Sequence, residues 1–193
     1  MRKLACRGFQ SFQYLRLVFA LACIGWVFQP VFAFSQPEDT QNLILGKVFK
    51  LYDGDTIAIK DDLGKEVRVQ IAYIDAPDMD EKTFDKQPLY TESIKLLSGL
   101  ILNKEVIIES FGKDKNGRVE GMVFLDKMNI NVEMVRRGMA EIYEPVRSNP
   151  SAFNKDYVQL LFDAENLAKS EKKGIWGHPD YISPFQFRRR AGQ

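Results

Sequence analysis

The chain contains one histidine, His178, and two cysteines, Cys6 and Cys23. Both cysteines lie in an N-terminal segment that we expect to be removed, so the mature chain would hold no disulfide and no cysteine nucleophile. His178 lies in a Gly-His-Pro turn after the last predicted helix, where a structural or surface role is expected. Catalytic devices of the Ser/His/Asp or Cys/His type therefore lack an obvious base, and metal sites built from histidine and cysteine are excluded.

Acidic side chains are absent from residues 1 to 33, which carry four of the 27 basic side chains. Without this segment the chain is slightly acidic, so any binding of nucleic acid must come from a local basic site rather than from bulk charge. The length of 193 residues and the 45% of hydrophobic residues suit one domain with a core. Disorder, collagen and coiled coil are excluded as descriptions of the whole chain.

The long apolar run, residues 17 to 28, follows basic residues and precedes the small-residue exit Val31-Phe-Ala33. This order predicts a secretory signal peptide over residues 1 to 33, cleaved after Ala33 or Ser35. One alternative is an uncleaved membrane anchor, but the apolar run is short for a membrane-spanning helix. Another is a lipoprotein, but its cleavage site before Cys23 would fall inside the apolar run. We therefore expect a secreted or periplasmic protein, monomeric and without stable membrane association once the leader is lost.

Residues 34 to 42 are polar and unpatterned, which predicts a flexible lead-in. From residue 43, short alternating apolar runs separated by turns predict three consecutive antiparallel strands, over residues 43 to 52, 55 to 60 and 65 to 74. In the third strand, Arg68 and Gln70 share the face that is available for function.

Helical spacing of apolar residues predicts a helix over residues 90 to 102 and a last helix over about 154 to 172. Two further strands, residues 105 to 110 and 118 to 125, lie after the first helix. Asn131 is expected to cap a short helix that runs to Arg137.

Three strands, a helix, two strands and C-terminal helices are the order of an OB-fold. We therefore predict an α+β fold, a five-stranded OB-fold β-barrel with packed C-terminal helices, over residues 43 to 178. The basic and aromatic tail, residues 179 to 193, is expected to be a solvated end whose aromatic side chains pack back onto the domain. The order of elements alone names no function.

Carboxylates and arginines are the remaining side chains that could take part in catalysis. Asp-Gly-Asp-Thr at residues 53 to 56 opens the second predicted strand, and Ile-Asp-Ala-Pro-Asp at 74 to 78 closes the third. Neighbouring strands could bring Asp55 and Asp75 together, and two such carboxylates need a cation or a shared proton. With oxygen ligands only, the cation would be Ca²⁺ or Mg²⁺. Taken singly, each fragment also suits an ordinary turn or strand end.

Five motifs occur in order over residues 44 to 176. They are Asp53-Gly-Asp-Thr56, Arg68 with Ile74-Asp-Ala-Pro77, Asp114-Lys-x-Gly-Arg118, Val135-Arg-Arg-Gly-Met-Ala140 and Ala168-x-x-x-x-Lys-Gly-Ile-Trp176. This ordered set resembles the thermonuclease family, whose type member is staphylococcal nuclease. The resemblance implies a Ca²⁺-dependent phosphodiesterase that cuts DNA and RNA with little sequence preference and leaves 3′-phosphates.

The resemblance also implies roles for residues of this chain. Asp55 and Asp75 fall on the two carboxylate ligands of calcium, and Ala76 falls on a residue that supplies a backbone carbonyl. Arg118 falls on an arginine that grips the scissile phosphate. Lys115 and Tyr143 are assigned to substrate binding, because Tyr143 can stack on a base in place of the turn tyrosine, which is replaced by an asparagine.

Two departures from the family pattern bear on activity. Gln70 stands where the family has a second phosphate-clamping arginine, and Arg68, about 6.6 Å back along the same strand face, can partly compensate. Asp78 stands where the family has a glutamate that positions or deprotonates the attacking water, and the loss of one methylene withdraws the carboxylate by about 1.5 Å.

We therefore expect a secreted nuclease, attenuated by Gln70 and Asp78, that acts on DNA and RNA with single strands favoured. The alternative is a non-catalytic OB module that binds nucleic acid or a protein and retains the calcium carboxylates as remnants.

Overall fold

The structure, a computed structural model, describes residues 42–192. The predicted signal peptide, residues 1 to 33, and the lead-in up to residue 41 lie outside the described residues, so their prediction stays untested. Within the described part of the chain, no helix is both long enough and apolar enough to cross a membrane.

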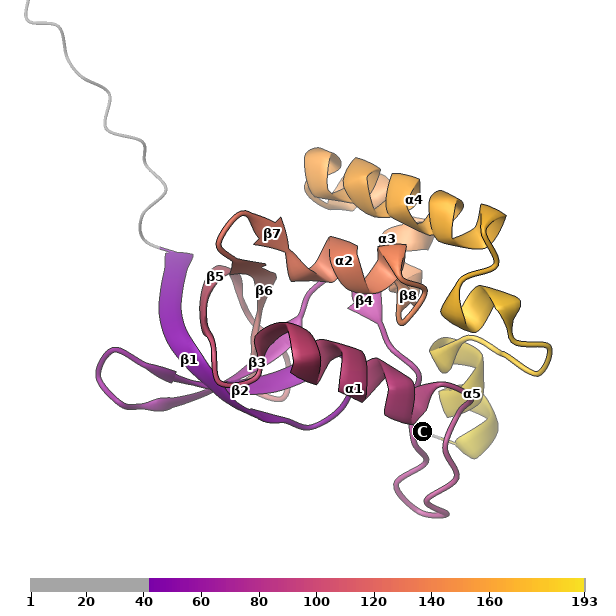
Figure 1. The fold of residues 1–193 in the computed structure, drawn as a ribbon, viewed down its shortest axis with the longest axis horizontal. Coiled ribbons are helices and arrows are strands. Elements are labelled where there is room, and N and C mark those ends of the chain that lie inside the picture. Colours follow the sequence, from indigo (N-terminus) through magenta and orange to yellow (C-terminus); the bar gives the residue numbers. More distant parts are fainter. Residues whose placement is uncertain (1–41, 193) are drawn as a thin grey trace, which may run out of the picture. The chain divides into compact units, whose positions relative to one another are not determined.

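Five strands form a closed barrel (Figure 1). They are β1 (Leu43–Leu51), β2 (Thr56–Asp61), β3 (Glu66–Ile71), β5 (Glu105–Lys113) and β6 (Val119–Leu125). Their order is β3-β2-β1-β5-β6, with antiparallel neighbours, and a parallel pairing of β3 with β6 closes the ring. The prediction of a five-stranded barrel in an α+β fold is confirmed.

Aliphatic side chains from all five strands fill the barrel. The fully or almost fully buried ones are Val48, Ile57, Ile59, Val69, Ile71, Val106, Ile108, Met122 and Val123. The alternation of side chains along each strand sends these residues inward, except Met122, which adjoins Val123 on β6 and so faces the opposite side. For the others, the predicted period-two pattern and the observed core agree.

Three two-residue strands were not expected. They are β4 (Ile74–Asp75), β7 (Met128–Asn129) and β8 (Glu141–Ile142), and β4 pairs with β8 outside the barrel. The third predicted strand ends early because Tyr73 has a φ of 66°, which redirects the chain before β4 begins. This break carries Asp75 out of the barrel wall and towards the candidate site.

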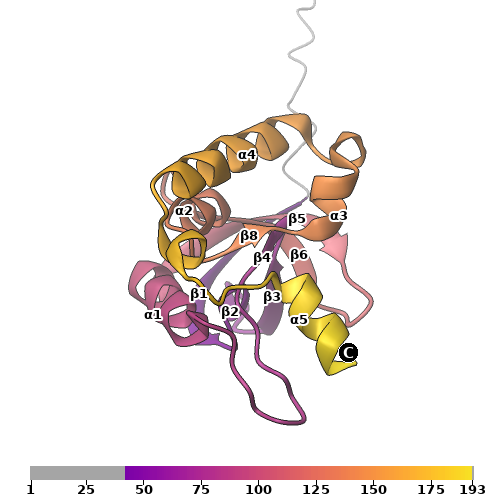
Figure 2. The same cartoon turned by 90° about the vertical axis from the view of Figure 1, so that its right-hand side faces the viewer.

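Helices cover the outside of the barrel. They are α1 (Tyr90–Ile101), α2 (Ile130–Arg136), α3 (Glu144–Ser148), α4 (Lys155–Ser170) and α5 (Pro184–Ala191), with short 3₁₀ helices η2 (Pro150–Ala152) and η3 (Gly174–Gly177). α2 packs against β6 and lies between the barrel and α4 (Figure 1). Figure 2 looks onto the end of the molecule where β4, β8 and α5 lie.

The expected cap of α2 was placed two residues too late. Asn129 is the N-cap, and its side chain accepts a hydrogen bond from the Val132 amide at 3.0 Å. Asn131 is instead fully buried, where it accepts from the Val123 amide at 2.9 Å and donates to the Ala72 carbonyl at 2.7 Å. Both positions carry asparagine two residues apart, so capping chemistry alone could not distinguish them.

Two glycines of the recognised motifs touch through their backbones. Gly138 has a φ of 65° and Gly174 a φ of 53°. A Cβ at Gly138 would lie 2.2 Å from the Lys173 carbonyl oxygen, and a Cβ at Gly174 would lie 2.0 Å from the Gly138 oxygen. Since the Ile175 amide donates to that same Gly138 oxygen at 2.9 Å, only glycine permits this contact between α2 and η3.

The C-terminal residues differ from the solvated end expected from the sequence. They form α5, whose N-cap is Ser183, with Pro184 in the first turn, where its missing N–H is harmless. Three arginines, Arg188 to Arg190, occupy the last turn, as the helix dipole favours, and Gly192 ends the helix with a φ of 70°.

A buried carboxylate on α4 holds β8 in place. Glu165, 1% exposed, accepts from the Ile142 amide at 3.0 Å and is ion-paired with Arg147 and Lys169. Burial alone would raise the pKa of Glu165, but the hydrogen bonds from Arg147, Lys169 and the Ile142 amide outweigh burial and lower it.

We expect Glu165→Ala to lower the free energy of unfolding by about 3 to 5 kcal/mol, because Arg147 and the Ile142 amide lose their partner. The lowered pKa means that this stabilisation is present above the ordinary glutamate pKa and is lost as the pH falls through the folded-state value. Urea unfolding at pH 7 and pH 4 measures both effects. Glu171→Ala, on the exposed end of α4, is the matched control, and an equal loss for the two variants would contradict the prediction.

Candidate active site

The turn between β1 and β2 carries the first carboxylates. One Asp53 oxygen, Oδ1, accepts from the backbone amides of Asp55 at 2.9 Å and Thr56 at 2.6 Å, which fixes the turn. Gly54 is required by close packing, because a Cβ there would lie 2.1 Å from Oγ of the buried Ser93 on α1. The helix α1 thus sets the position of the Asp-Gly-Asp turn.

Asp55 is held on both carboxylate oxygens. Oδ1 accepts from Nε2 of Gln70 at 2.8 Å and lies 3.2 Å from Oγ1 of Thr56, while Oδ2 accepts from the Ala76 amide at 2.9 Å. Burial raises the pKa of Asp55 well above its usual range, and the negative charges of Asp53 and Asp75 raise it further. Three carboxyl groups are therefore gathered at this end of the barrel, and Asp53 and Asp75 disfavour the charged form of Asp55.

A chain of polar contacts links this carboxylate to Arg118. Oγ1 of Thr56 donates to Oε1 of Gln70 at 3.0 Å, in keeping with the pairing of these two residues between β2 and β3. Arg118 reaches the same Thr56 oxygen with Nη1 at 3.4 Å, and its Nε is ion-paired with Asp114 at 2.7 Å. The turn between β5 and β6 thus aims a guanidinium at the Asp55 carboxylate cluster.

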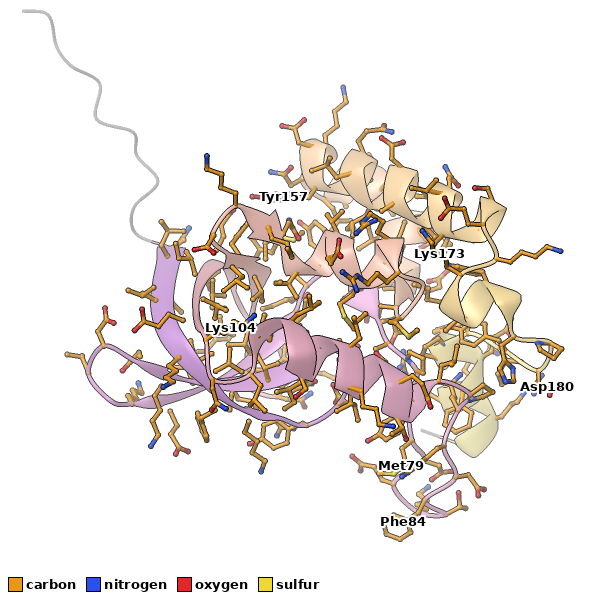
Figure 3. All side chains as sticks on the ribbon, in the orientation of Figure 1. Met79, Phe84, Lys104, Tyr157, Lys173 and Asp180 are labelled. Carbon is orange, nitrogen blue, oxygen red and sulfur yellow. The ribbon has the colours of Figure 1, made fainter. Side chains whose placement is uncertain are left out.

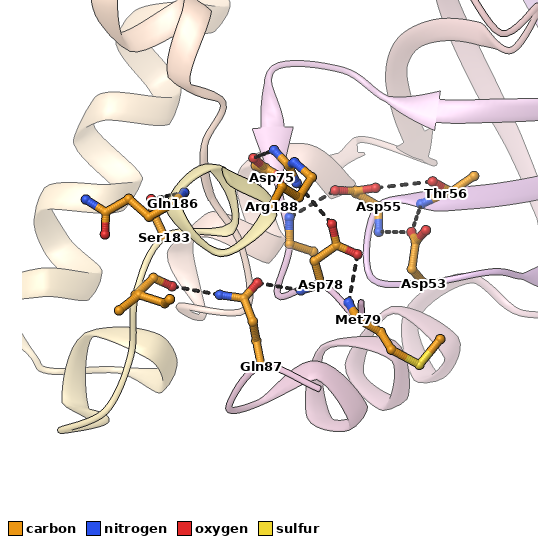
Figure 4. A network of polar contacts seen from close by, with 12 residues as sticks. Asp53, Asp55, Thr56, Asp75, Asp78, Met79, Gln87, Ser183, Gln186 and Arg188 are labelled. Carbon is orange, nitrogen blue, oxygen red and sulfur yellow. Dashed lines mark hydrogen bonds and ion pairs between the residues drawn. The ribbon is translucent and has the colours of Figure 1, made fainter. Parts of the chain in front are cut away.

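The second carboxylate group lies after β3. Asp75, 5% exposed, accepts from Arg188 of α5 on both oxygens, at 2.9 Å to Oδ1 and 2.6 Å to Oδ2 (Figure 4). Asp78 accepts from Nη1 of the same guanidinium at 3.1 Å through Oδ2, and its Oδ1 accepts from the Met79 amide at 2.7 Å. The hydrogen bonds and the negative charges of Asp75 and Asp78 raise the pKa of Arg188 above its ordinary value, so the guanidinium stays charged.

The loop between β4 and α1 is organised by one buried amide. Gln87, 3% exposed, accepts from the Asp78 amide at 2.7 Å and donates to the Ile182 carbonyl at 2.8 Å (Figure 4). The loop tip carries Phe84, which is 70% exposed and lies with Met79 at the outer end of the loop in Figure 3. The base of the loop is thus fixed to the C-terminal segment.

Three other predicted site residues are exposed. Arg68 places its guanidinium 4.0 Å from the ring centroid of Tyr52, on an exposed part of β3. Lys115 is exposed at the β5–β6 turn. Tyr143 is 37% exposed and lies next to β4, since its amide donates to the Tyr73 carbonyl at 2.9 Å. These contacts therefore do not support the prediction that Arg68 compensates for the neutral Gln70.

Sequence reasoning missed Arg188 and Glu141. Glu141 pairs with Asp75 across β4 and β8, and burial, together with the charge of Asp75, raises the pKa of Glu141 to about 7. Its carboxylate accepts from the Tyr181 hydroxyl at 3.3 Å. Neither residue belongs to a recognised motif, although Glu141 directly follows the Gly-Met-Ala segment.

The oxygen-only donor set fits a hard divalent cation. Within residues 42–192, no three His, Cys, Asp or Glu side chains are grouped as a metal site. The charge of Asp75 nevertheless disfavours the ionised form of Asp55, and a bound cation would relieve this repulsion. Ala76 follows Asp75 in the chain, and its backbone amide donates a hydrogen bond to Asp55.

Comparisons with known proteins agree on one family. The family model described as staphylococcal nuclease homologue matches residues 68–178. The protein named "Uncharacterized endonuclease" of Escherichia coli is 34% identical over 161 residues, which cover 83% of this chain and 94% of that protein. A Haemophilus influenzae protein of the same name is 34% identical over 144 residues, covering 75% of this chain and 72% of its own length.

The protein named "Micrococcal nuclease" of Shigella flexneri is 28% identical over 155 residues, covering 76% of this chain and 81% of that protein. The match over more than half of the chain and the Escherichia coli relative, together with the closed barrel, confirm the resemblance predicted from the motifs. The chain belongs to the family of staphylococcal nuclease homologues.

Proposed function

We propose that this chain is a calcium-dependent endonuclease that hydrolyses phosphodiester bonds of DNA and RNA with little sequence preference and leaves 3′-phosphates. One observation carries the proposal: a single end of the barrel gathers the carboxylates of Asp55 and Asp75, the Asp78 carboxylate and the guanidinium of Arg118. Relatives named endonuclease and micrococcal nuclease support the reaction class.

Hydrolysis of a phosphodiester requires stabilisation of charge that develops on the phosphoryl oxygens and orientation of a water molecule. Asp55 and Asp75, with the Ala76 carbonyl, would hold a calcium ion, which supplies Lewis-acid stabilisation of that charge when bound. The protein's own residues perform the remaining tasks.

Arg118 is the phosphate-binding residue. Its Nε is occupied by Asp114, so the guanidinium plane is fixed while the Nη groups remain oriented towards the site. A planar guanidinium can donate two parallel hydrogen bonds to a phosphate, which a neutral donor cannot match.

Asp78 is the residue that orients or deprotonates the attacking water. The Met79 amide on Oδ1 holds the carboxylate in place, and Oδ2 faces the guanidinium of Arg188. Tyr143 supplies a stacking surface for a base of a single strand, and Lys115 supplies positive charge for the backbone.

Two features favour a slow enzyme or, as the second candidate, a non-catalytic module that binds nucleic acid or a protein. Gln70 carries no charge and is engaged with Asp55 and Thr56. Asp78 is one methylene shorter than glutamate, and a misplaced catalytic group can cost on the order of a hundredfold in rate. Export, which the leader supports, belongs to the proposal as well: the working enzyme would be a secreted or periplasmic monomer.

The test is an assay of the purified protein on denatured DNA and on RNA, in calcium and in a calcium chelator. We expect cleavage of both polymers in calcium, faster on single strands than on duplex DNA, and no cleavage in the chelator. Product ends should accept a 3′-label only after phosphatase treatment, because the phosphate stays on the 3′ side.

Binding of an intact oligonucleotide without cleavage, by a protein whose circular dichroism shows it folded, would favour the binding module. Cleavage that is equal in calcium and in the chelator would contradict calcium dependence while leaving the nuclease assignment in place.

A further inference from the structure

The C-terminal segment after η3 is anchored at defined points before it enters α5. The Tyr181 hydroxyl donates a hydrogen bond to the Glu141 carboxylate, and the ring of Tyr181 packs edge-on against that of Trp176, with 6.1 Å between the ring centroids. The Gln87 side chain donates a hydrogen bond to the Ile182 carbonyl at 2.8 Å, and Ser183 is the N-cap of α5. The direction of α5, and therefore the position of its last turn, is set by these contacts.

The helix α5 places Arg188 against the carboxylates of Asp75 and Asp78, which follow β3. Its guanidinium makes a bidentate ion pair with Asp75 and a third contact with Asp78 (Figure 4). The Arg188 side chain is 29% exposed and the Asp75 side chain 7% exposed, so the pair is largely removed from water. Charge-assisted bidentate bonds of this kind are among the stronger hydrogen bonds in proteins.

A cation bound by Asp75 would need the oxygens that Arg188 occupies. Both oxygens of Asp75 already accept a hydrogen bond from the guanidinium, and a metal ion placed on them would bring a second positive charge into contact with Arg188. Like charges at contact distance in a half-buried site repel strongly. The guanidinium and a divalent cation therefore exclude one another at Asp75.

We propose that α5 is an autoinhibitory element whose Arg188 competes with the divalent cation for Asp75 and Asp78. The inference rests on the proposed cation site at Asp55 and Asp75. Arg188 brings a positive charge onto both oxygens of Asp75, and cation binding there requires the guanidinium to leave. The same displacement frees Asp78, so metal binding and release of the carboxylate assigned to the attacking water occur together.

Calcium titration calorimetry tests the competition on the purified full-length protein. Arg188→Gln removes the competing charge, so we expect it to bind calcium about tenfold to a hundredfold more tightly than the unmodified protein, the range expected for lost hydrogen bonds to a charged group. Arg190→Gln removes an equal charge from an exposed position of the same helix and should bind calcium within about twofold of the unmodified protein. Equal affinities for the two variants would overturn the proposal.

Hydrogen exchange gives a second readout that needs no substitution. Added calcium should speed exchange of the α5 amides, residues 185 to 191, in the unmodified protein, while the amides of α1 serve as the internal reference. Protection of α5 by calcium, or no change, would overturn the proposal even if Arg188→Gln fails to fold.

Two outcomes separate this inference from the proposed function. Tighter calcium binding by Arg188→Gln, without nucleic-acid cleavage by any variant, would support the competition and contradict the nuclease. Calcium-dependent cleavage by the unmodified protein, with no gain in calcium affinity for Arg188→Gln, would contradict the competition alone. Asp75→Asn locates the cation: if it leaves calcium affinity unchanged, the ion binds elsewhere, and the assigned cation site and the competition are wrong.

Discussion

Asp55→Ala is expected to lower kcat/KM for denatured DNA in calcium by about a thousandfold or more. The substitution removes one of the two carboxylates that would hold the cation, and the charge stabilisation supplied by a bound cation is worth several kcal/mol in a transition state. Each factor of ten in rate corresponds to about 1.36 kcal/mol. The initial rate of cleavage of a single-stranded oligonucleotide, with calcium varied at fixed substrate, measures the loss.

Asp55 is a sharper test than Asp75, because Asp75 is also ion-paired with Arg188 and its removal would leave that arginine with Asp78 alone. Asp62→Ala is the matched control, since Asp62 is an exposed carboxylate in the turn between β2 and β3. It should cleave at a rate close to that of the unmodified protein. Retention of cleavage by Asp55→Ala at the same level as the control would contradict the assigned cation site.

Arg118→Lys is expected to lower kcat by about a hundredfold to a thousandfold with little change in KM, the loss seen when one preorganised donor to a developing negative charge is removed. Lysine keeps the charge but not the planar fork. Its three N–H donors diverge from one nitrogen, so they cannot pair with Asp114 and also present two parallel hydrogen bonds to a phosphate. The effect should therefore fall on the transition state rather than on substrate binding.

Steady-state kinetics over a range of oligonucleotide concentrations separates kcat from KM. Arg136→Lys, at an exposed arginine of α2 that pairs with Glu133, makes the same exchange away from the site and should leave both constants unchanged. A rise in KM at unchanged kcat would show that Arg118 binds the ground state and the transition state equally, and would remove its assigned role in the chemistry.

The features that the sequence predicted well depend on local patterns. Alternating apolar residues and Asp-Gly or Asn-Gly turns predicted the five barrel strands, since both signals act within a few residues of the chain. The motif glycines were identified by resemblance, and the contact between Gly138 and Gly174 now explains why neither position admits a side chain. The turn at Gly54 is explained in the same way by α1.

The features that were missed depend on contacts between distant parts of the chain. The position of the α2 cap was decided by burial of Asn131, which donates to the carbonyl of Ala72 in the turn between β3 and β4. Arg188 belongs to a run of three arginines, and only the orientation of α5 selects the first of them for Asp75, 113 residues earlier. Residue 188 also lies beyond the region that the family model matches, so no motif marked it.

The parallel pairing of β3 with β6 has a consequence for how the protein acquires its activity. It joins the first half of the barrel to the second, and it brings Arg118 within reach of Thr56, 62 residues earlier. Contacts of such sequence separation form late in folding, because loop closure must precede them. An unfolded chain therefore lacks the assembled site, and the proposed hydrolysis of nucleic acid requires a molecule whose barrel has closed.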